Sequence, residues 1–256
     1  RITREDVERA AKAPAAAPKG AIAPEAASAT RGAPSGEVTR TPVRGIRKIV
    51  AELMHHSLQS TAQLTITTEA DVTAAVELRE RMSRDFEFTY TDLLIQAAAR
   101  ALLKHPRMNS HMDGNEIVTA AQANVGVAVA LEDGLIVPVI HDAARKSLRE
   151  IAALSWELGE KARTGKLKLE EVNGGTFTIS NLGTYGVDAF TPILNQGETG
   201  ILGVGRIIEK PAIHRGEITR RAMMTMSLTI DHRVIDGAPA ARFLRTLIDL
   251  FNYGER

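Results

Sequence analysis

Residues 222–237 read AMMTMSLTIDHRVIDG, a strand pattern followed by the start of a helix. Apolar and polar side chains alternate from Ala222 to Ile230, which predicts a half-buried strand. Continuing the alternation places His232 on the apolar side, at the mouth of the buried face. Histidine titrates near neutral pH, so an imidazole held there is suited to act as a general base. In isolation, a structural histidine is the favoured interpretation.

The end of the same stretch predicts the start of the last helix. Asp236 is followed by Gly237, Ala238 and Pro239, which gives it the position of a helix N-cap. Capping is the favoured role of Asp236 when the residue is considered alone. Asp236 also follows His232 by four residues, close enough to help fix the local geometry.

A second suggestive stretch reads NGGTFTISNLG at residues 173–183. A turn leads into a strand on which Phe177 and Ile179 face one way, while Thr178 and Ser180 face the other. The hydroxyl of Ser180 ends the polar face and is able to donate to a developing oxyanion. A terminal serine more commonly caps a turn, and this is the favoured role for Ser180 alone.

Helices and a hairpin account for much of the remaining globular region. Apolar residues recur at helical spacing over 46–58 and 93–102, and a capping box at 147–150 starts a helix that ends near Gly165. Strands at 125–131 and 135–140 flank a hairpin turn, and Pro138 favours an edge position or a bulge. We therefore predict an α+β domain with a mixed, largely antiparallel sheet and helices packed on it.

The chain divides into three parts. Residues 1–9 have the pattern of the end of a small domain, and the chain lacks an initiator methionine, so we expect a piece of a longer protein. Residues 10–40 are rich in Ala and Pro with few bulky apolar side chains, which predicts a flexible linker. Residues 41–256 form the globular domain.

Composition argues against several classes of function. With 32 basic and 31 acidic residues, the chain gives no electrostatic reason to expect nucleic acid or an anionic membrane as a partner. The absence of cysteine excludes disulfides, thiolate metal sites and a cysteine nucleophile. The sequence contains no membrane-spanning run and does not start as a signal peptide. We expect a soluble, cytoplasmic protein.

Other candidate motifs are weak. The histidines show no HExxH or paired spacing with carboxylates, so we expect no metal site. Residues 203–205 read GVG and lack the third glycine of a dinucleotide-binding loop. The basic residues Arg44, Arg47 and Lys48 are better explained as a solvated helix face than as a phosphate site.

The joint occurrence of two motifs is specific. His-x-x-x-Asp-Gly after a strand, with Thr-Phe-Thr-Ile-Ser-Asn-Leu-Gly placed so that Ser180 precedes His232 by 52 residues, closely resembles the catalytic domain of the dihydrolipoamide acyltransferases. These are the E2 components of 2-oxoacid dehydrogenase complexes. The resemblance runs from about Thr41 to Phe251. Residues 1–9 resemble a remnant of the peripheral subunit-binding domain of these enzymes, followed by their usual linker.

The resemblance implies a fold and a reaction. The fold is the two-layer sandwich of chloramphenicol acetyltransferase, and the reaction moves an acyl group between a dihydrolipoyl thiol and coenzyme A. The family histidine matched by His232 deprotonates the attacking thiol, and the hydroxyl matched by Ser180 stabilises the oxyanion. The family aspartate matched by Asp236 holds the site together. Phe190 matches an aromatic residue of the substrate channel, although a core aromatic on a strand explains it nearly as well.

The resemblance also implies partners. The lipoyl group is expected on an upstream domain absent from this chain, and the decarboxylase (E1) and dihydrolipoamide dehydrogenase (E3) are the expected partners. Family members form homotrimers in which histidine and hydroxyl come from different chains, and trimers assemble into cubic or icosahedral cores. A leucine-rich tail contributes to contacts between trimers, whereas this chain stops at Asn252–Arg256, so the trimer is the firmer expectation.

The identity of the acyl group and two alternative functions stay open. Residues 57–65 look most like those of acetyl-transferring members that serve pyruvate or acetoin dehydrogenase, and succinyl and branched-chain enzymes are less similar. A free-standing acetyltransferase of the chloramphenicol type shares His-x-x-x-Asp-Gly, but the linker argues against it. A catalytically silent scaffold is the other alternative, and the retained His232 and Ser180 count against it.

Overall fold

The structure is a computed structural model that describes residues 38–132 and 134–254. Residues from Val43 onward form one compact unit. Within the described ranges, no helix is both long and apolar enough to cross a bilayer. The expectations for residues 1–9 and for most of the linker at 10–40 lie outside the described residues and stay predictions.

The compact unit combines helices and strands along its whole length. The helices are α2 (Gly45–Ser60), α3 (Thr73–Met82), α4 (Tyr90–Lys104), α5 (Leu148–Arg163) and α6 (Gly237–Tyr253). The strands of the main sheet are β1 (Gln63–Asp71), β4 (Val125–Val127), β7 (Val139–Ile140), β8 (Phe177–Asn181), β9 (Gly200–His214) and β10 (Glu217–Asp231). Small separate hairpins pair β2 (Ser110–Asp113) with β3 (Glu116–Thr119) and β5 (Val129–Leu131) with β6 (Gly134–Ile136).

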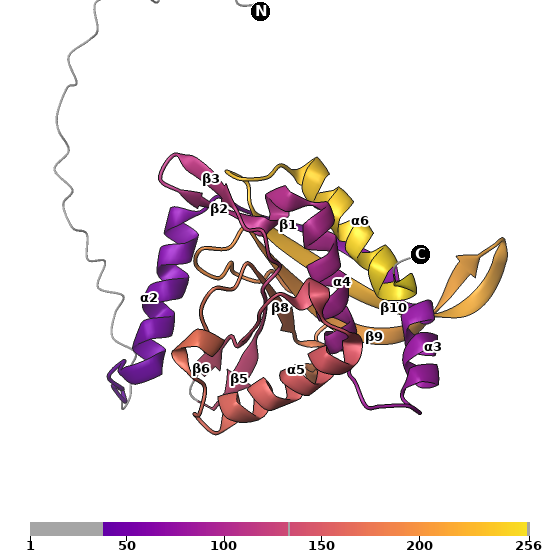
Figure 1. Cartoon of the computed structure of the whole chain (residues 1–256), viewed down its shortest axis with the longest axis horizontal. Helices are drawn as coiled ribbons and strands as arrows, with labels where there is room; N and C mark the ends of the chain where they lie inside the picture. Colours follow the sequence, from indigo (N-terminus) through magenta and orange to yellow (C-terminus); the bar gives the residue numbers. More distant parts are fainter. Residues whose placement is uncertain (1–37, 133, 255–256) are drawn as a thin grey trace, which may run out of the picture. The chain divides into compact units, whose positions relative to one another are not determined.

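The main sheet is mixed and has the strand order β1-β10-β9-β8-β4-β7. Figure 1 labels four of these strands, β1, β10, β9 and β8. β10 pairs antiparallel with β1 and β9, and β4 pairs antiparallel with β7, whereas β8 pairs parallel with β9 and β4. The predicted hairpin is confirmed, because Leu131 pairs with Gly134 and Val125 with Ile140. Pro138 directly precedes β7, the edge strand. The predicted α+β class is therefore confirmed.

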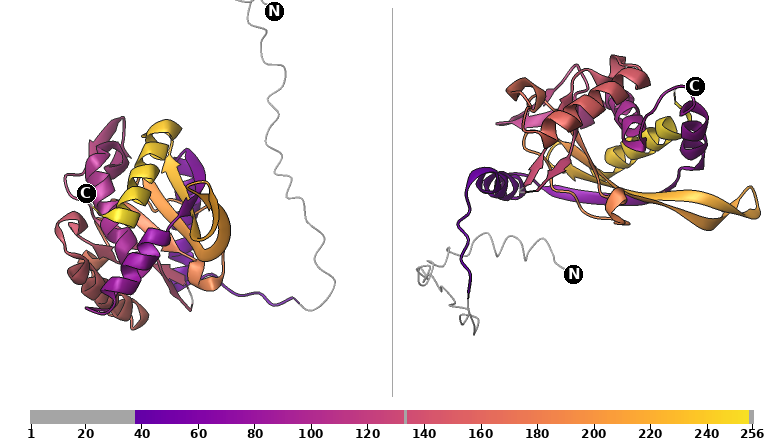
Figure 2. Two further views of the ribbon diagram at one scale, coloured as in Figure 1. Left: turned by 90° about the vertical axis from the view of Figure 1, so that its right-hand side faces the viewer. Right: turned by 90° about the horizontal axis from the view of Figure 1, so that it is seen from below.

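Helices α4, α5 and α6 cover one face of this sheet, so the domain has two layers (Figure 2). The core lies between the layers, where the buried rings of Phe177 in β8 and Phe243 in α6 meet edge-on with their centroids 5.5 Å apart. The predicted capping box is confirmed: Ser147 and Glu150 each bond the other's backbone at the start of α5.

β10 follows the predicted alternation and extends beyond it. Its methionines at 224 and 226, with Leu228 and Ile230, belong to the core. On the other face, Ser227 and Thr229 exchange hydroxyl hydrogen bonds with threonines of β1 at 3.1 and 2.7 Å. The strand starts at Glu217, earlier than predicted, because β9 and β10 continue past the end of β1 as a long hairpin (Figure 1).

Helix α2 forms where its spacing predicts a helix, but its apolar face does not enter the core. Three side chains that share one face of the helix are more than a third exposed in the single chain, and we name them the α2 stripe: Ile46, Ile49 and Leu53. The buried residue of this helix is Ser57, whose hydroxyl donates to the Leu194 carbonyl at 2.7 Å. Periodicity predicts an apolar face without specifying what covers it.

Glu198 places a carboxyl group inside the fold, beside β8. Its side chain accepts hydrogen bonds from Thr178 Oγ1 at 2.7 Å and from Asn195 Nδ2 at 3.0 Å. Burial raises the pKa of Glu198 to about 7, because the hydrogen bonds from Thr178 and Asn195 lower it by less. The protonated form of Glu198 therefore favours the folded chain.

We predict that protonation of Glu198 makes the free energy of unfolding depend on pH. The stabilisation by the protonated carboxyl group is fully present below pH 4.5, the ordinary pKa of glutamate, and is lost as the pH rises through about 7. The loss amounts to roughly 3 kcal/mol in the free energy of unfolding. Urea unfolding at pH 5 and pH 8, at one protein concentration, should show this loss in the wild type and not in Glu198→Gln. The exposed Glu170→Gln is the control and should follow the wild type. Equal pH dependence in all three proteins would contradict the prediction.

Candidate functional site

His232 lies in the turn between β10 and α6. β10 ends at Asp231, and the Asp231 carbonyl oxygen closes the turn by accepting from the amides of Val234 and Ile235 at 2.9 and 3.2 Å. The side chain of His232 is 45% exposed in the single chain. The prediction that strand alternation continues to His232 is therefore wrong, because β10 ends at Asp231 and the turn begins there.

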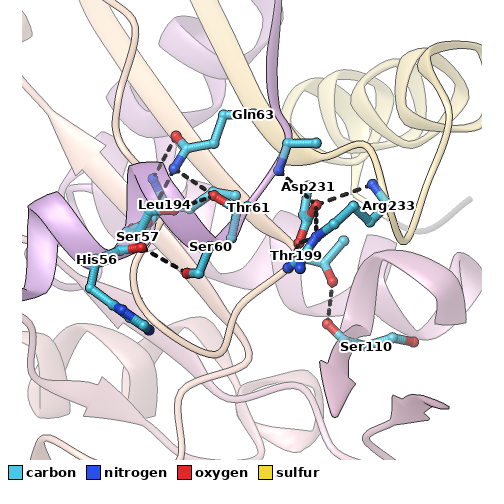
Figure 3. A network of polar contacts seen from close by, with 11 residues as sticks. His56, Ser57, Ser60, Thr61, Gln63, Ser110, Leu194, Thr199, Asp231 and Arg233 are labelled. Atoms are coloured by element: carbon cyan, nitrogen blue, oxygen red, sulfur yellow. Dashed lines mark hydrogen bonds and ion pairs between the residues drawn. The ribbon is translucent and has the colours of Figure 1, made fainter. Parts of the chain in front are cut away.

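The backbone at His232 is tied to the residue that precedes β1. The His232 amide donates to the Ala62 carbonyl at 2.8 Å, and the Ala62 amide donates to Asp231 Oδ1 at 3.2 Å. The Arg233 guanidinium binds both carboxylate oxygens of Asp231, with its shortest contact at 2.6 Å (Figure 3). The histidine thus stands on a fixed backbone with an exposed ring.

Asp236 occupies the predicted N-cap position of α6, but its side chain does not cap the helix. Its Oδ1 lies 3.6 Å from Nδ1 of His232, within reach of an ion pair and longer than a hydrogen bond. The capping role favoured from the sequence is therefore not seen. The carboxylate faces the imidazole instead, which leaves Nε2 of His232 as the nitrogen turned away from this pair.

Ser180 lines a pocket of about 280 Å³, together with Val127, Leu135 and Tyr185. Asn181, the neighbour of Ser180, caps the turn after β8, because its Oδ1 accepts a hydrogen bond from the Gly183 amide at 2.9 Å. Asn181 therefore fills the capping role that the sequence favoured for Ser180. The serine hydroxyl is placed at a pocket wall, where a ligand oxygen is able to approach it.

Phe190 lies beside Ser180, in the loop between β8 and β9. A methyl group added to Gly203 would stand 3.0 Å from the ring atom Cζ of Phe190. Gly203 is the registered partner of Ser180 in the parallel pair, so the ring packs over the strand next to the serine. The alternative of a core aromatic on a strand is wrong, because Phe190 is partly exposed and belongs to no strand.

The register of the sheet keeps Ser180 and His232 apart within one chain. Ser180 pairs with Gly203, and Gly203 pairs with Ser227, which precedes His232 by five residues. Two strand spacings sideways and five residues along the strand give a separation on the order of 20 Å. One chain therefore does not bring the two candidate catalytic groups together.

Two further pockets adjoin the one at Ser180. The Ser180 pocket shares Thr91 and Arg163 with a second pocket of about 210 Å³. The second pocket shares Thr89 and Ser155 with a third of about 460 Å³, whose walls include a further arginine, Arg79. Arg163 and Arg79 are among the residues that line these pockets. Sequence reasoning missed the pockets, because their residues come from many separate helices and strands.

Sequence reasoning also missed the polar network that holds the corner between α2 and β1 (Figure 3). Gln63 Nε2 donates to Ser57 Oγ at 3.1 Å and to Thr61 Oγ1 at 3.0 Å, and Gln63 Oε1 accepts from the Leu194 amide at 3.2 Å. Ala62, the anchor of the His232 backbone, sits between these residues. The ion pair between Asp231 and Arg233 could have been inferred from the sequence, because the two residues have opposite charges and lie on either side of His232 in a turn.

The remaining candidates form no further site in the part of the chain that the structure describes. In residues 38–132 and 134–254, no three His, Asp or Glu side chains are grouped so that they could hold a metal ion. Gly203 and Gly205 belong to β9, not to a phosphate loop. Lys48 forms an exposed ion pair with Glu52 at 3.8 Å, as expected for a solvated helix face.

Comparison with known sequences identifies relatives over most of the chain. Residues 35–254 match the model of the 2-oxoacid dehydrogenases acyltransferase catalytic domain. The acetyltransferase component of the acetoin cleaving system of Bacillus subtilis is 46% identical over 212 residues, which are 80% of this chain and 53% of the relative. The succinyltransferase component of the 2-oxoglutarate dehydrogenase complex of Azotobacter vinelandii is 40% identical over 218 residues, 82% of this chain and 55% of that one. The chain thus spans about half the length of these relatives.

Solved structures agree with the sequence relatives. The Azotobacter vinelandii dihydrolipoamide acetyltransferase has a TM-score of 0.81 at 36% identity, covering 85% of this chain and 93% of that one. The cubic core of a pyruvate dehydrogenase multienzyme complex gives 0.82 at 37% identity, covering 86% and 94%. Chloramphenicol acetyltransferase, at 16% identity and a TM-score of 0.51 over 83% of this chain and all of that one, shows the shared fold alone. The chain belongs to the 2-oxoacid dehydrogenase acyltransferase family, as a catalytic domain.

Proposed function

We propose that this chain is a dihydrolipoamide acyltransferase, which moves an acyl group between a dihydrolipoyl thiol and coenzyme A. Its catalytic residues are His232 and Ser180, and Asp236 positions the histidine. The observation that carries the proposal is a coincidence of spacing. A serine, a histidine and an asparagine were investigated for their role in the mechanism of the Azotobacter vinelandii acetyltransferase, and they are separated by 52 and four positions. Ser180, His232 and Asp236 have the same separations, with aspartate in place of asparagine.

In the proposed reaction, His232 takes the proton from the coenzyme A thiol as the sulfur attacks the thioester carbonyl carbon. The new carbon–sulfur bond places negative charge on the carbonyl oxygen, and the Ser180 hydroxyl donates a hydrogen bond to that oxyanion. The intermediate collapses, the old carbon–sulfur bond breaks, and the proton passes from His232 to the departing dihydrolipoyl sulfur. A general base contributes about 10²–10⁴-fold and one oxyanion donor about 10²–10³-fold. The Asp236 carboxylate faces Nδ1 of the imidazole, which suits Nε2 to the proton transfer.

We infer that each site is shared between two chains of a homotrimer. The separation on the order of 20 Å between Ser180 and His232 in one chain far exceeds the reach of a hydrogen bond. A threefold assembly brings the histidine end of one chain to the serine end of the next, and the same contact repeats around the axis. The likeness to a subunit of a cubic pyruvate dehydrogenase core supports assembly of trimers into a larger core.

We assign the three adjoining pockets that start at Ser180 to coenzyme A. This molecule is long and carries phosphate groups, and Arg163 and Arg79 are among the residues that line the pockets. Arginine forks bind phosphate oxygens in pairs, which suits them to this role. Phe190 stands on the loop beside Ser180, where it contacts the acyl or dihydrolipoyl group.

The proposed acyl group is acetyl, in a pyruvate or acetoin dehydrogenase complex. The acetoin relative has the higher identity, 46% against 40% for the succinyl-transferring relative, and residues 57–65 resemble acetyl enzymes. A decarboxylase and a dihydrolipoamide dehydrogenase would then act with this chain in the cytoplasm, with a lipoyl group carried on another domain.

The first test of the function measures acetyl-dihydrolipoamide after mixing the chain with acetyl-CoA and free dihydrolipoamide. We expect turnover, and we expect His232→Ala to lower kcat by about 10²–10⁴-fold because the base is lost. His214→Ala, on the β9–β10 hairpin, is the matched control and should keep its turnover. Absence of product would indicate a silent scaffold. Preference for chloramphenicol over dihydrolipoamide would indicate an antibiotic acetyltransferase.

A second test separates catalysis from capping at Ser180. We expect Ser180→Ala to lower kcat by about 10²–10³-fold with little change in melting temperature, since an oxyanion donor acts in the transition state. Ser147→Ala is the matched control, because the Ser147 side chain caps the start of α5. That variant should lose about 1 kcal/mol of stability and keep its turnover. Normal turnover in Ser180→Ala would remove the serine from the mechanism.

A third test concerns the shared site. His232→Ala chains and Ser180→Ala chains are mixed under conditions that let trimers reassemble, and exchange is checked by mass spectrometry. In a random mixture roughly one interface in four joins an intact histidine to an intact serine, so about a quarter of wild-type activity should return. Activity that stays at the level of the single variants, once exchange has been verified, would place both residues within one chain.

A further inference from the structure

The carboxylate of Asp231 is the most heavily bonded group around the turn that carries His232. Its side chain is 3% exposed, whereas the Arg233 side chain that pairs with it is 42% exposed. The Arg233 guanidinium donates from Nε to both carboxylate oxygens at 3.0 Å and from Nη2 to Oδ2 at 2.6 Å. This forked contact compensates a charge that is otherwise buried.

The same carboxylate fixes the backbone on both sides of His232. Asp231 Oδ1 accepts a hydrogen bond from the Arg233 amide at 3.1 Å. This bond closes a turn whose middle residue is His232. Asp231 Oδ1 also accepts from the Ala62 amide at 3.2 Å, while the Ala62 carbonyl accepts from the His232 amide at 2.8 Å. The backbone of His232 is therefore held in a clamp made of Asp231 and Ala62.

A further bond connects this clamp to the start of β9. The Asp231 amide donates to the Thr199 carbonyl at 3.0 Å, and the Thr199 hydroxyl in turn donates to the Ser110 carbonyl (Figure 3). Burial raises the pKa of Asp231, but the hydrogen bonds from Arg233 and from the backbone amides outweigh it and hold the pKa below its usual value. The carboxylate stays charged, so its hydrogen bonds to the amides are of the stronger, charge-assisted kind.

We propose that Arg233 and Asp231 are positioning residues for His232: the ion pair holds the backbone of the histidine so that its ring meets the thiol in the correct place. This inference rests on the proposed role of His232 as the base. In this role Arg233 acts on His232 through Asp231. A catalytic group displaced by about 1 Å loses up to about 10²-fold in rate, so a loosened clamp lowers turnover even in a fully folded protein.

A matched ion pair at the opposite end of β10 provides the control. Arg221 Nε donates to Asp71 Oδ2 at 2.7 Å, joining β10 to β1 far along the strand from His232. Arg221→Met and Arg233→Met remove the same kind of charge and keep most of the side-chain volume. A loss of general stability lowers the melting temperature in both variants, whereas a loss of positioning lowers kcat in Arg233→Met alone.

The experiment measures kcat, the KM for coenzyme A, melting temperature and trimer mass for the complete chain and its variants. For Arg233→Met we expect kcat to fall about 10-fold to 10²-fold with KM changed less than about twofold, the pattern of a lost transition-state interaction. Arg221→Met should keep kcat within about twofold of the wild type. Arg233→Lys restores the charge without the fork, so its kcat should lie above that of Arg233→Met and still at least about threefold below the wild type.

Two results would overturn the inference. One is a kcat for Arg233→Met, or for Arg233→Lys if the first variant does not fold, within about twofold of the wild type. The other is an equal loss of kcat in Arg221→Met. His232→Ala is measured in the same assay, because near-normal turnover in that variant refutes the proposed base itself. Loss of turnover in His232→Ala with normal turnover in the Arg233 variants refutes the positioning role alone.

Discussion

β10 pairs with β1 on one side and with β9 on the other, and this register fixes which of its side chains enter the core. A slip of one residue in this register would turn the buried methionines and Leu228 to the opposite face and bring the hydroxyls of Ser227 and Thr229 into the core. The same register sets where the strand stops, and therefore where the turn with His232 begins. Through β9 it also sets the position of β8, and with it Ser180. One set of backbone hydrogen bonds thus places both halves of the proposed site.

The two halves are built in different ways. Ser180 belongs to a strand paired on both sides, and its pocket is walled by β4 and by the loops around it. His232 is on a turn, where strand pairing no longer fixes the chain. The buried Asp231 carboxylate, paired with Arg233 and bonded to two backbone amides, takes over that task. Proposed catalysis requires an exposed ring, so the rigidity has to come from the backbone beneath it. This division explains why a carboxylate as buried as Asp231 is kept ionised so close to the imidazole.

Much of the fold could be predicted from the sequence, because its signals are local. The alternation of β10, the capping box at Ser147 and the hairpin before Pro138 depend on neighbouring residues, and each is confirmed. The site residues were recognised by their spacing, but their surroundings were not. The exposure of His232 depends on the residue at which a strand ends, and element boundaries are the least certain part of such a prediction. The cap at Asn181 could not be separated from one at Ser180, because adjacent polar side chains carry the same signal. The anchors from Ala62 and Thr199 are 169 and 32 positions from Asp231, beyond the reach of any local pattern.

The α2 stripe also affects the newly made chain. Three large apolar side chains on one face of the helix form a surface that water solvates poorly, and such surfaces promote association. None of the three belongs to the hydrophobic core of the single chain. Solubility during synthesis then depends on how quickly the helix finds a covering surface compared with how often it meets other unassembled chains. The yield of soluble protein is therefore a matter of concentration and timing as well as of thermodynamic stability.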